Sequence, residues 1–175
     1  AVTAGDHDAA FGEMLRAFDR YGPDLDAIEL DAVGHRVAHG ADRFTGPVIA
    51  DDAVLDAIAD LVPLAPLHNP ANLAGLQAAR RAFRHVPQVA AFDTAFHHTL
   101  PEVAATYAVP AHWRDELGVR RYGFHGISHQ DAARRVWDLM GRPPRSAIVV
   151  LHLGNGASAC AVRDGVSVDT SMGMT

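Results

Sequence analysis

The sequence predicts an α/β protein. Up to a double proline at residues 143 and 144, segments with helical spacing of apolar residues alternate with short strand-like runs. Beyond it, strand-like runs follow one another, separated by tight turns. This order is typical of an α/β domain followed by the opening of another. We therefore expect one domain over residues 1–144 and the truncated start of a second over residues 145–175.

The N-terminal part is expected to begin with a helix at residues 7–21, because Phe11, Leu15 and Phe18 recur at helical spacing. The next apolar run, IELDAVGHRV at residues 28–37, is expected to form a strand.

Two further helices are expected in the middle of the chain. Asp51 or Asp52 can act as the N-cap of the first, since a carboxylate accepts a hydrogen bond from an exposed N–H of the first turn. In the second, Asn69 is expected at the N-cap and Pro70 at the first helical position. This helix is expected to end near His85.

The C-terminal half is expected to contain a strand, two helices and a strand meander. The strand at residues 87–96 places Asp93 near its carboxyl end, where open α/β sheets bind ligands. Helices are expected over residues 110–118 and 128–140. The meander consists of SAIVVLHLG, ASACAVRDG and VSVDTS, joined by turns at Gly154-Asn155-Gly156 and Asp164-Gly165.

Composition excludes several classes of function. A net charge of −6 leaves no basic surface for nucleic acid, and no run approaches the roughly 18 apolar residues of a membrane span. The single cysteine, Cys160, cannot form an internal disulfide or a thiolate zinc cluster, which favours a cytoplasmic location. The chain contains no lysine, so arginine must supply any cationic contact to an anion.

The sequence is expected to be an internal piece of a longer protein. It does not begin with methionine, and its last residues, VSVDTSMGMT, form a strand-like run without a stop signal.

Glycine, histidine and charged residues concentrate in a few short segments. Taken singly, each is weak evidence, because a histidine near a strand end is most often a structural residue. Their joint occurrence indicates a functional site. The segments are GHRVAHGA (34–41), PLHNPAN (66–72), FDTAFHHTLPE (92–102), YGFHGISH (122–129) and HLGNGAS (152–158).

In content, order and spacing, FDTAFH, RRYGFHG, SH and HLGNGAS followed by DTSMG resemble the acetate and propionate kinase (acetokinase) family, from about residue 30 to residue 175. The resemblance implies two ribonuclease-H-like domains of the actin-like ATPase and sugar kinase type, with the active site in the cleft between them. The chain would hold the first domain without its first strands, and the opening β-hairpin of the second.

The resemblance also implies an activity. The protein would transfer the γ-phosphoryl group of ATP to acetate or propionate, which gives an acyl phosphate and ADP. Mg²⁺ would be bound by residues outside this chain, and the intact enzyme would be a homodimer.

The resemblance further implies catalytic roles. Arg36 matches the family arginine that binds the carboxylate or the transferred phosphoryl group, a task suited to a planar guanidinium. His125 matches the histidine that steadies the phosphoryl oxygens, and Asp93 matches the catalytic aspartate. We expect Asp93 to orient an arginine or the substrate, because a carboxylate substrate is already ionised at neutral pH and needs no general base.

The binding residues follow from the same resemblance. Ala38, Leu67 and Phe124 match the pocket for the acyl group, and the family commonly has valine at the position of Ala38. The shorter alanine predicts that propionate is accepted comparatively well. Ala41 stands where a second glycine is usual. The nucleotide phosphates are assigned to His152, Leu153, Gly154, Asn155 and Gly156.

Two alternatives remain open. The chain could be a catalytically incompetent fragment that acts only in folding or interaction, since the family's opening strand-turn and adenosine-binding half have no counterpart here. It could also be a histidine-rich metallohydrolase, because His35 and His39, and likewise His125 and His129, are four residues apart. However, HRVAH carries arginine where a zinc protease has glutamate.

Overall fold

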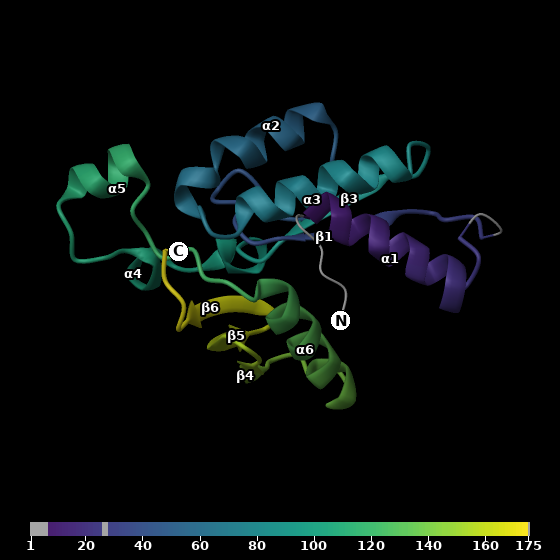
Figure 1. Ribbon diagram of the computed structural model, residues 1–175. Coiled ribbons are helices and arrows are strands. Elements are labelled where there is room, and N and C mark those ends of the chain that lie inside the picture. Colours follow the sequence, from purple (N-terminus) through teal and green to yellow (C-terminus); the bar gives the residue numbers. More distant parts are fainter. Residues whose placement is uncertain (1–6, 26–27, 175) are drawn as a thin grey trace. The chain divides into compact units, whose positions relative to one another are not determined.

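The computed structural model describes residues 7–25 and 28–174, and the chain divides into two compact units (Figure 1). Unit 1 comprises Ala1–Val37 and Val48–Ala90, and unit 2 comprises Ala38–Pro47 and Ala91–Thr175. The double proline lies inside unit 2. The domain boundary expected there stays a prediction about the longer protein.

Unit 1 combines a small sheet with three helices. The sheet has the order β1-β3-β2, and α3 packs against β1, α1 and α2. Strand β3 begins in unit 1 and its last two residues belong to unit 2. The elements are α1 (His7–Tyr21), β1 (Val33–Val37), β2 (Val48–Ile49), α2 (Asp52–Asp60), the 3₁₀ turn η1 (Val62–Leu64), α3 (Asn69–Ala82) and β3 (Gln88–Phe92).

The start of α2 shows how its sequence specifies a helix. The Asp51 carboxylate accepts a hydrogen bond from the Val54 N–H at 2.9 Å, so Asp51 rather than Asp52 is the N-cap. Leu55 and Ile58, four and seven residues after the cap, are buried. The expected capped, amphipathic helix is therefore confirmed.

Three expected boundaries in unit 1 are wrong by a few residues. The N-cap of α3 is His68 and not Asn69, because the Asn69 N–H already donates to the Ala65 carbonyl at 2.9 Å. The helix ends at Ala82, before His85, since Phe83 leaves helical geometry. The strand expected over residues 28–37 begins only at Val33.

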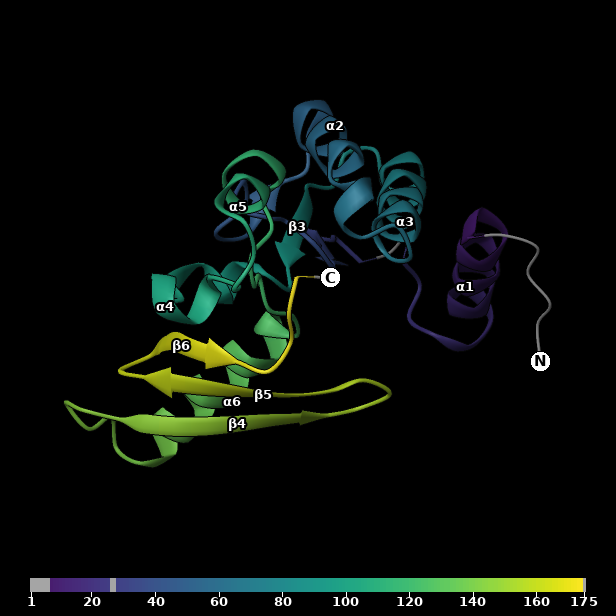
Figure 2. The same ribbon diagram turned by 90° about the vertical axis from the view of Figure 1, so that its left-hand side faces the viewer.

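Unit 2 contains an antiparallel sheet, β4-β5-β6, with α6 and η2 packed against it (Figure 2). A cluster of buried side chains from η2, α6, β4 and β5 forms its core: Phe96, Ala133, Ile148, Val150, Cys160 and Val162. The elements are η2 (Ala95–Thr99), α4 (Glu102–Ala105), α5 (Ala111–Leu117), α6 (Gly126–Leu139), β4 (Ala147–Leu153), β5 (Ala157–Arg163) and β6 (Val166–Thr170).

Both expected turns of the meander are confirmed. β4 and β5 pair up to Leu153 opposite Ala157, so the glycine turn at residues 154–156 closes the hairpin. Asp164 and Gly165 have φ values of 51° and 84°. Two successive positive φ values give the turn whose twist matches that of the flanking strands.

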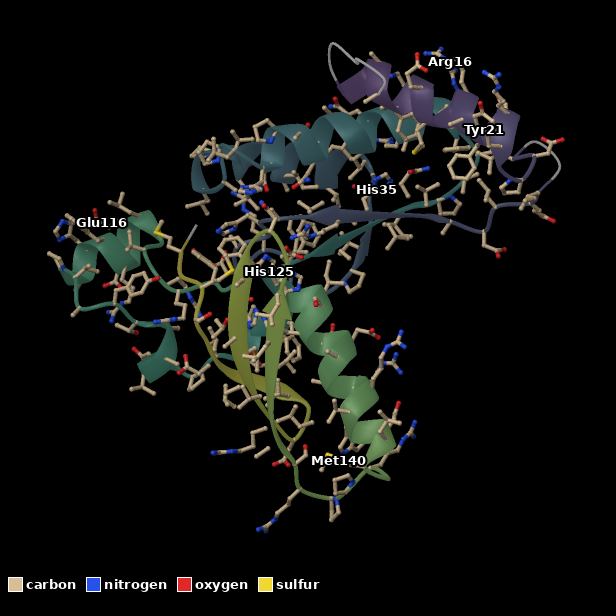
Figure 3. The ribbon with its side chains drawn as sticks, turned by 60° about the horizontal axis from the view of Figure 1, so that its bottom comes forward. Arg16, Tyr21, His35, Glu116, His125 and Met140 are labelled. Atoms are coloured by element: carbon tan, nitrogen blue, oxygen red, sulfur yellow. The ribbon has the colours of Figure 1, made fainter. Side chains whose placement is uncertain are left out.

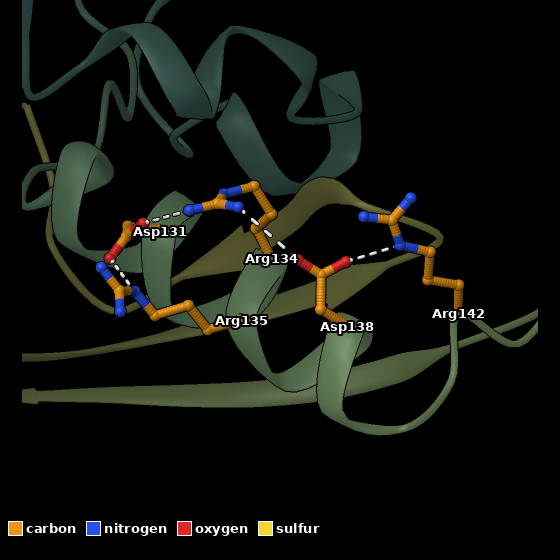
Figure 4. Close-up of polar contacts among 5 residues, drawn as sticks. All are labelled: Asp131, Arg134, Arg135, Asp138 and Arg142. Atoms are coloured by element: carbon orange, nitrogen blue, oxygen red, sulfur yellow. Dashed lines mark hydrogen bonds and ion pairs between the residues drawn. The ribbon is translucent and has the colours of Figure 1, made fainter.

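Ion pairs join exposed side chains of α6 to one another and to Arg142, which lies just beyond the end of this helix (Figure 4). Asp131 pairs with Arg134 at 2.9 Å and with Arg135 at 2.6 Å, and Asp138 pairs with Arg134 at 3.5 Å and with Arg142 at 2.8 Å. Residues three and four apart face each other on a helix, so these contacts support α6 without tertiary partners.

Candidate functional site

The candidate site in unit 2 is built where β3 ends and α6 begins. The expected start of α6 at Ser128 is wrong, because the helix begins at Gly126, directly after His125 in left-handed geometry with φ of 56°. The Gly126 N–H donates to the Asp93 carbonyl at 2.9 Å. A Cβ atom on Gly126 would lie 2.2 Å from that oxygen, so this contact requires glycine.

The other glycine of the YGFHG segment also has a packing role. Gly123 has φ of 75°, and a Cβ atom there would lie 2.6 Å from Cδ2 of His97. Dense packing therefore accounts for both glycines that flank Phe124 and His125. The idea that they let the backbone approach phosphate stays a prediction.

Asp93 occupies the position that the sequence predicts. It directly follows β3 and is 2% exposed. The hydroxyl of the next residue, Thr94, accepts a hydrogen bond from the Gly40 N–H at 3.0 Å, which ties residues 38–47 to this strand end. The backbone around Asp93 is thus anchored on two sides.

The glycine turn of residues 154–156 lies beside two histidines. The rings of His125 and His152 are stacked, with centroids 4.0 Å apart and planes inclined by 25°. A Cβ atom on Gly156 would lie 3.4 Å from Cε1 of His125, and one on Gly154 would lie 3.2 Å from Nε2 of His152. His125 is labelled in Figure 3, and it directly precedes α6.

A buried hydrogen-bond network lies behind His125. The Ser158 hydroxyl is 2.8 Å from His125 Nδ1 and 2.8 Å from His129 Nε2. His129 is fully buried, and burial together with the neighbouring histidines lowers its pKa from 6.5 to about 4. His129 is therefore neutral at physiological pH.

Sequence reasoning missed Ser158 and assigned His129 only to a metal pair. The available signals were the spacing of His125 and His129, one helical turn apart, and the alternation of Ser158 with buried Cys160 on β5.

A second buried histidine, His39, supports Phe124. Its Nε2–H donates to the Met174 carbonyl at 3.0 Å, and its Nδ1 accepts from the Ala41 N–H at 3.0 Å. The ring packs edge-on against Phe124 with centroids 5.4 Å apart, and burial lowers the pKa of His39. Ala41 itself has φ of 49°, in the left-handed region that favours glycine, the residue that the family resemblance leads us to expect there.

The expected acyl-pocket residues divide between the units. Ala38 and Phe124 are buried in unit 2, with 9% and 8% of their surface exposed. Leu67 belongs to unit 1, where it precedes α3 and is 87% exposed. Arg36 also belongs to unit 1 and lies on an exposed position of β1. Within unit 2 the structure therefore brings together the aspartate, histidine and glycine-turn members of the predicted set.

A separate, mostly apolar cavity of about 360 Å³ lies in unit 2. Phe92, Phe96, Ile127 and Val166 contribute to its lining. Asp93 and the histidines of the network do not line it, so it is distinct from the candidate site.

Over residues 7–25 and 28–174, no three histidine, cysteine, aspartate or glutamate side chains are arranged to hold a metal ion. In the same part of the chain, no helix is both long and apolar enough to cross a bilayer.

The geometry defines a general class of protein. It is an α/β protein in which buried Asp93 directly follows a strand, the place where open α/β sheets bind ligands.

Comparison with known proteins identifies the family. The chain matches the model of the Acetokinase family over residues 1–175, and it belongs to this family. It is 53% identical to an acetate kinase of Deinococcus radiodurans, and the match covers 100% of this chain and 44% of that protein. It is 58% identical to an acetate kinase of Leifsonia xyli, over 97% of this chain and 43% of that protein. The resemblance inferred from the sequence is thereby confirmed.

Solved structures agree. The Porphyromonas gingivalis acetate kinase superimposes with a TM-score of 0.90 at 41% identity, over 97% of this chain and 43% of that one. A propionate kinase from Francisella tularensis gives a TM-score of 0.87 at 41% identity, over 96% of this chain and 43% of that one. The predicted α/β class is confirmed. The chain spans less than half the length of the relatives it matches.

Proposed function

We propose that the full-length protein transfers the γ-phosphoryl group of ATP to a short-chain carboxylate, acetate or propionate. The observation that carries this proposal is the cluster of Asp93, His125 and the glycine turn of residues 154–156 within unit 2. Membership of the Acetokinase family supports it.

The reaction joins two anions, so positioning and charge stabilisation supply most of the catalysis. A carboxylate oxygen attacks the γ-phosphorus, the bond to the bridging oxygen of ADP breaks, and ADP leaves. Arg36 would bind the carboxylate or the transferred group with two parallel N–H donors, and His125 would donate to a phosphoryl oxygen.

The remaining residues would orient the reactants. Backbone N–H groups of residues 154–156, together with His152, would hold the nucleotide phosphates. Asp93 would orient an arginine or the substrate and would not remove a proton, because the attacking carboxylate carries none at neutral pH. Mg²⁺ would neutralise phosphate charge, and we place its ligands in sequence outside residues 1–175.

The architecture and assembly of the longer protein belong to the same proposal. It would consist of two actin-like, ribonuclease-H-like domains, of which this chain contributes the first without its opening strands and the opening hairpin of the second. We also infer a cytoplasmic homodimer from the family resemblance.

Ala38 sets the expected acid preference. If Ala38, Leu67 and Phe124 line the acyl pocket, replacing the family's usual valine by alanine leaves room for a longer chain. One or two methylenes of pocket fit are worth about 1–3 kcal/mol, enough to shift the preference without excluding acetate. Ala38→Val should lower the ratio of kcat/KM for propionate to that for acetate about tenfold or more. An unchanged ratio would contradict the assignment.

A hydroxamate assay tests the activity itself. The full-length protein should form acyl hydroxamate only when ATP, Mg²⁺ and acetate or propionate are all present. His125→Ala should lower kcat by about 10²–10³-fold, as does loss of a donor to a developing charge in other enzymes. If the wild-type protein forms no acyl phosphate with either acid, the proposed function is wrong.

The 175-residue chain alone is a separate question. It covers 44% of the length of its Deinococcus relative, and catalytic parts that act as a unit are lost together. We expect its turnover to lie far below that of the full-length protein, so that alone it would act only in folding or interaction. Robust hydroxamate formation by this chain would overturn that expectation.

A further inference from the structure

The Ser158 hydroxyl sits between two imidazole nitrogens and has a single hydrogen. Its oxygen lies 2.8 Å from both His125 Nδ1 and His129 Nε2. A hydroxyl can donate to only one of two ring nitrogens, so at least one ring must donate to the hydroxyl. If both rings donated, the buried hydroxyl hydrogen would have no acceptor, because these two nitrogens are its only partners among the residues described. The hydrogen bonds therefore run in one of two directions, and each direction fixes a different tautomer of His125.

His129 decides between the two directions. It is neutral and carries one N–H, and its Nδ1 is buried with no hydrogen-bond partner among the residues described. If Nδ1 carried the hydrogen, a donor would be buried without an acceptor, which is rarer in proteins than an under-used acceptor. With the hydrogen on Nε2, His129 donates to Ser158, and Ser158 donates to Nδ1 of His125.

His97 shows the same pattern in the same unit. Its Nε2 is 3.0 Å from the carbonyl oxygen of Phe124, which can only accept, so Nε2 carries the hydrogen. Its Nδ1, 2.8 Å from the Ser167 hydroxyl, then accepts from that serine. Buried serines on two neighbouring strands thus each donate to Nδ1 of a histidine.

We propose that Ser158 and His129 are positioning residues that hold His125 as the tautomer with its hydrogen on Nε2. The inference rests on the proposed function, in which His125 donates to a phosphoryl oxygen. The other tautomer would present the Nε2 lone pair to that anionic oxygen, which is repulsive. No proton is transferred along the chain of hydrogen bonds. It acts only by fixing which nitrogen of His125 carries the hydrogen.

The direct test is ¹⁵N NMR of the histidine rings in the full-length protein. The His125 signals are assigned by their loss in His125→Gln. We expect a pyridine-like resonance for Nδ1 and a pyrrole-like resonance for Nε2. In Ser158→Ala, the two nitrogens should move toward averaged shifts as both tautomers become populated. A pyrrole-like Nδ1 in the wild-type protein, or unchanged shifts in Ser158→Ala, would overturn the proposal.

Kinetics give the second readout. Ser158→Ala should lower kcat on the order of 10- to 100-fold, with little change in KM for the acid, as loss of an orienting partner does elsewhere. Ser146→Ala is the matched control, because Ser146 is a buried serine just before β4 whose hydroxyl has no hydrogen-bond partner among the described residues. It should leave kcat unchanged. A normal kcat in Ser158→Ala would contradict the proposal.

A pair of substitutions at His129 separates positioning from folding. His129→Gln keeps an N–H donor near the place of Nε2 and should retain most of kcat, whereas His129→Leu removes the donor and should behave like Ser158→Ala. Equal loss of kcat in both variants, with normal folding by circular dichroism, would contradict the proposal. NMR of the wild-type protein needs neither variant nor activity, so it decides the tautomer even if the proposed reaction is not found.

Discussion

Replacing Gly126 by alanine should destabilise the protein and disrupt the candidate site together. The new Cβ atom would lie 2.2 Å from the Asp93 carbonyl oxygen and 3.0 Å from Cβ of Phe96. Real Cβ atoms essentially never approach another heavy atom closer than 3.0 Å, so β3 and α6 must separate by roughly 0.8 Å.

That separation has a calculable cost. The hydrogen bond from the Gly126 N–H to Asp93 is 2.9 Å long, and stretching it by this amount breaks it. Its loss costs about 1 kcal/mol. The forced repacking around Phe96 adds about 1–3 kcal/mol, and the better helix propensity of alanine returns at most about 1 kcal/mol. We expect a net loss of about 1–4 kcal/mol in the free energy of unfolding.

Gly75 provides the matched control. It also lies in a helix, in the interior of α3, but a Cβ atom there would meet nothing within 4 Å. Gly75→Ala should therefore raise the free energy of unfolding by about 0.5–1 kcal/mol, through the lower entropy of the unfolded chain. The two glycine-to-alanine changes are expected to have opposite signs.

Urea unfolding followed by helical circular dichroism measures both variants, and fluorescence of Trp137 on α6 reports on unit 2. Hydroxamate formation by the full-length protein should also fall in Gly126→Ala, because the backbone of Asp93 moves. A Gly126→Ala variant as stable as the wild-type protein would refute the close approach of Gly126 to the Asp93 carbonyl, on which the candidate site depends.

Three further predictions concern single side chains. The pKa of His129 is about 4 in the folded protein, against an ordinary value of 6.5. As the pH falls, the unfolded state therefore binds a proton before the folded state does. Acidification from pH 6.5 to about pH 4 should lower the free energy of unfolding by on the order of 3 kcal/mol. His129→Gln should make the free energy of unfolding depend less on pH in this range. An unchanged dependence on pH would contradict the assignment to His129. Burial raises the pKa of the Cys160 thiol, so iodoacetamide should label this cysteine only after unfolding, as measured by mass spectrometry. Rapid labelling of the native protein would contradict the burial of Cys160. The ion pairs of Asp131 with Arg134 and Arg135 are exposed, so salt should screen them. Asp131→Asn should therefore lower the thermal midpoint slightly in low salt but not in 1 M salt, where charges are screened over about 3 Å. The hydrogen bond from Arg135 holds the pKa of Asp131 below its usual value. The stability that these ion pairs contribute is therefore lost as the pH falls through that lowered value. A change in the thermal midpoint that did not depend on salt would contradict the exposed pairing.

Local signals allowed the regular parts of the fold to be predicted. The Asp51 cap of α2 and the Asp164-Gly165 turn depend on neighbouring residues only, and both were recognisable. Boundaries set by distant contacts were not. The start of α6 depends on the hydrogen bond from Gly126 to Asp93, a residue 33 positions earlier, so a reading that relied on Ser128 as a starting residue placed it two residues late.

The candidate site was predictable only in part for the same reason. Resemblance to a family points to individual residues such as Asp93 and His125, but it does not show what supports them. Ser158 reaches His125 across 33 positions, and this contact depends on which face of β5 turns inward and on the register of the sheet. The spacing of four residues between His125 and His129 suggested a metal pair, and it gave no sign that the Ser158 hydroxyl lies between the two rings.

The backbone at His125 gives an independent reason to assign this residue a functional role. Its φ of 56° lies in the left-handed region, where a side chain costs about 1–2 kcal/mol and glycine costs little. Glycine stands on the next position and at Gly123, so the local sequence readily uses glycine where packing requires it. A histidine kept in strained geometry, half-buried against His152 and hydrogen-bonded to Ser158, is better explained by its imidazole than by its backbone. The strain and the hydrogen-bond network therefore favour a functional role for His125, on grounds separate from the family resemblance.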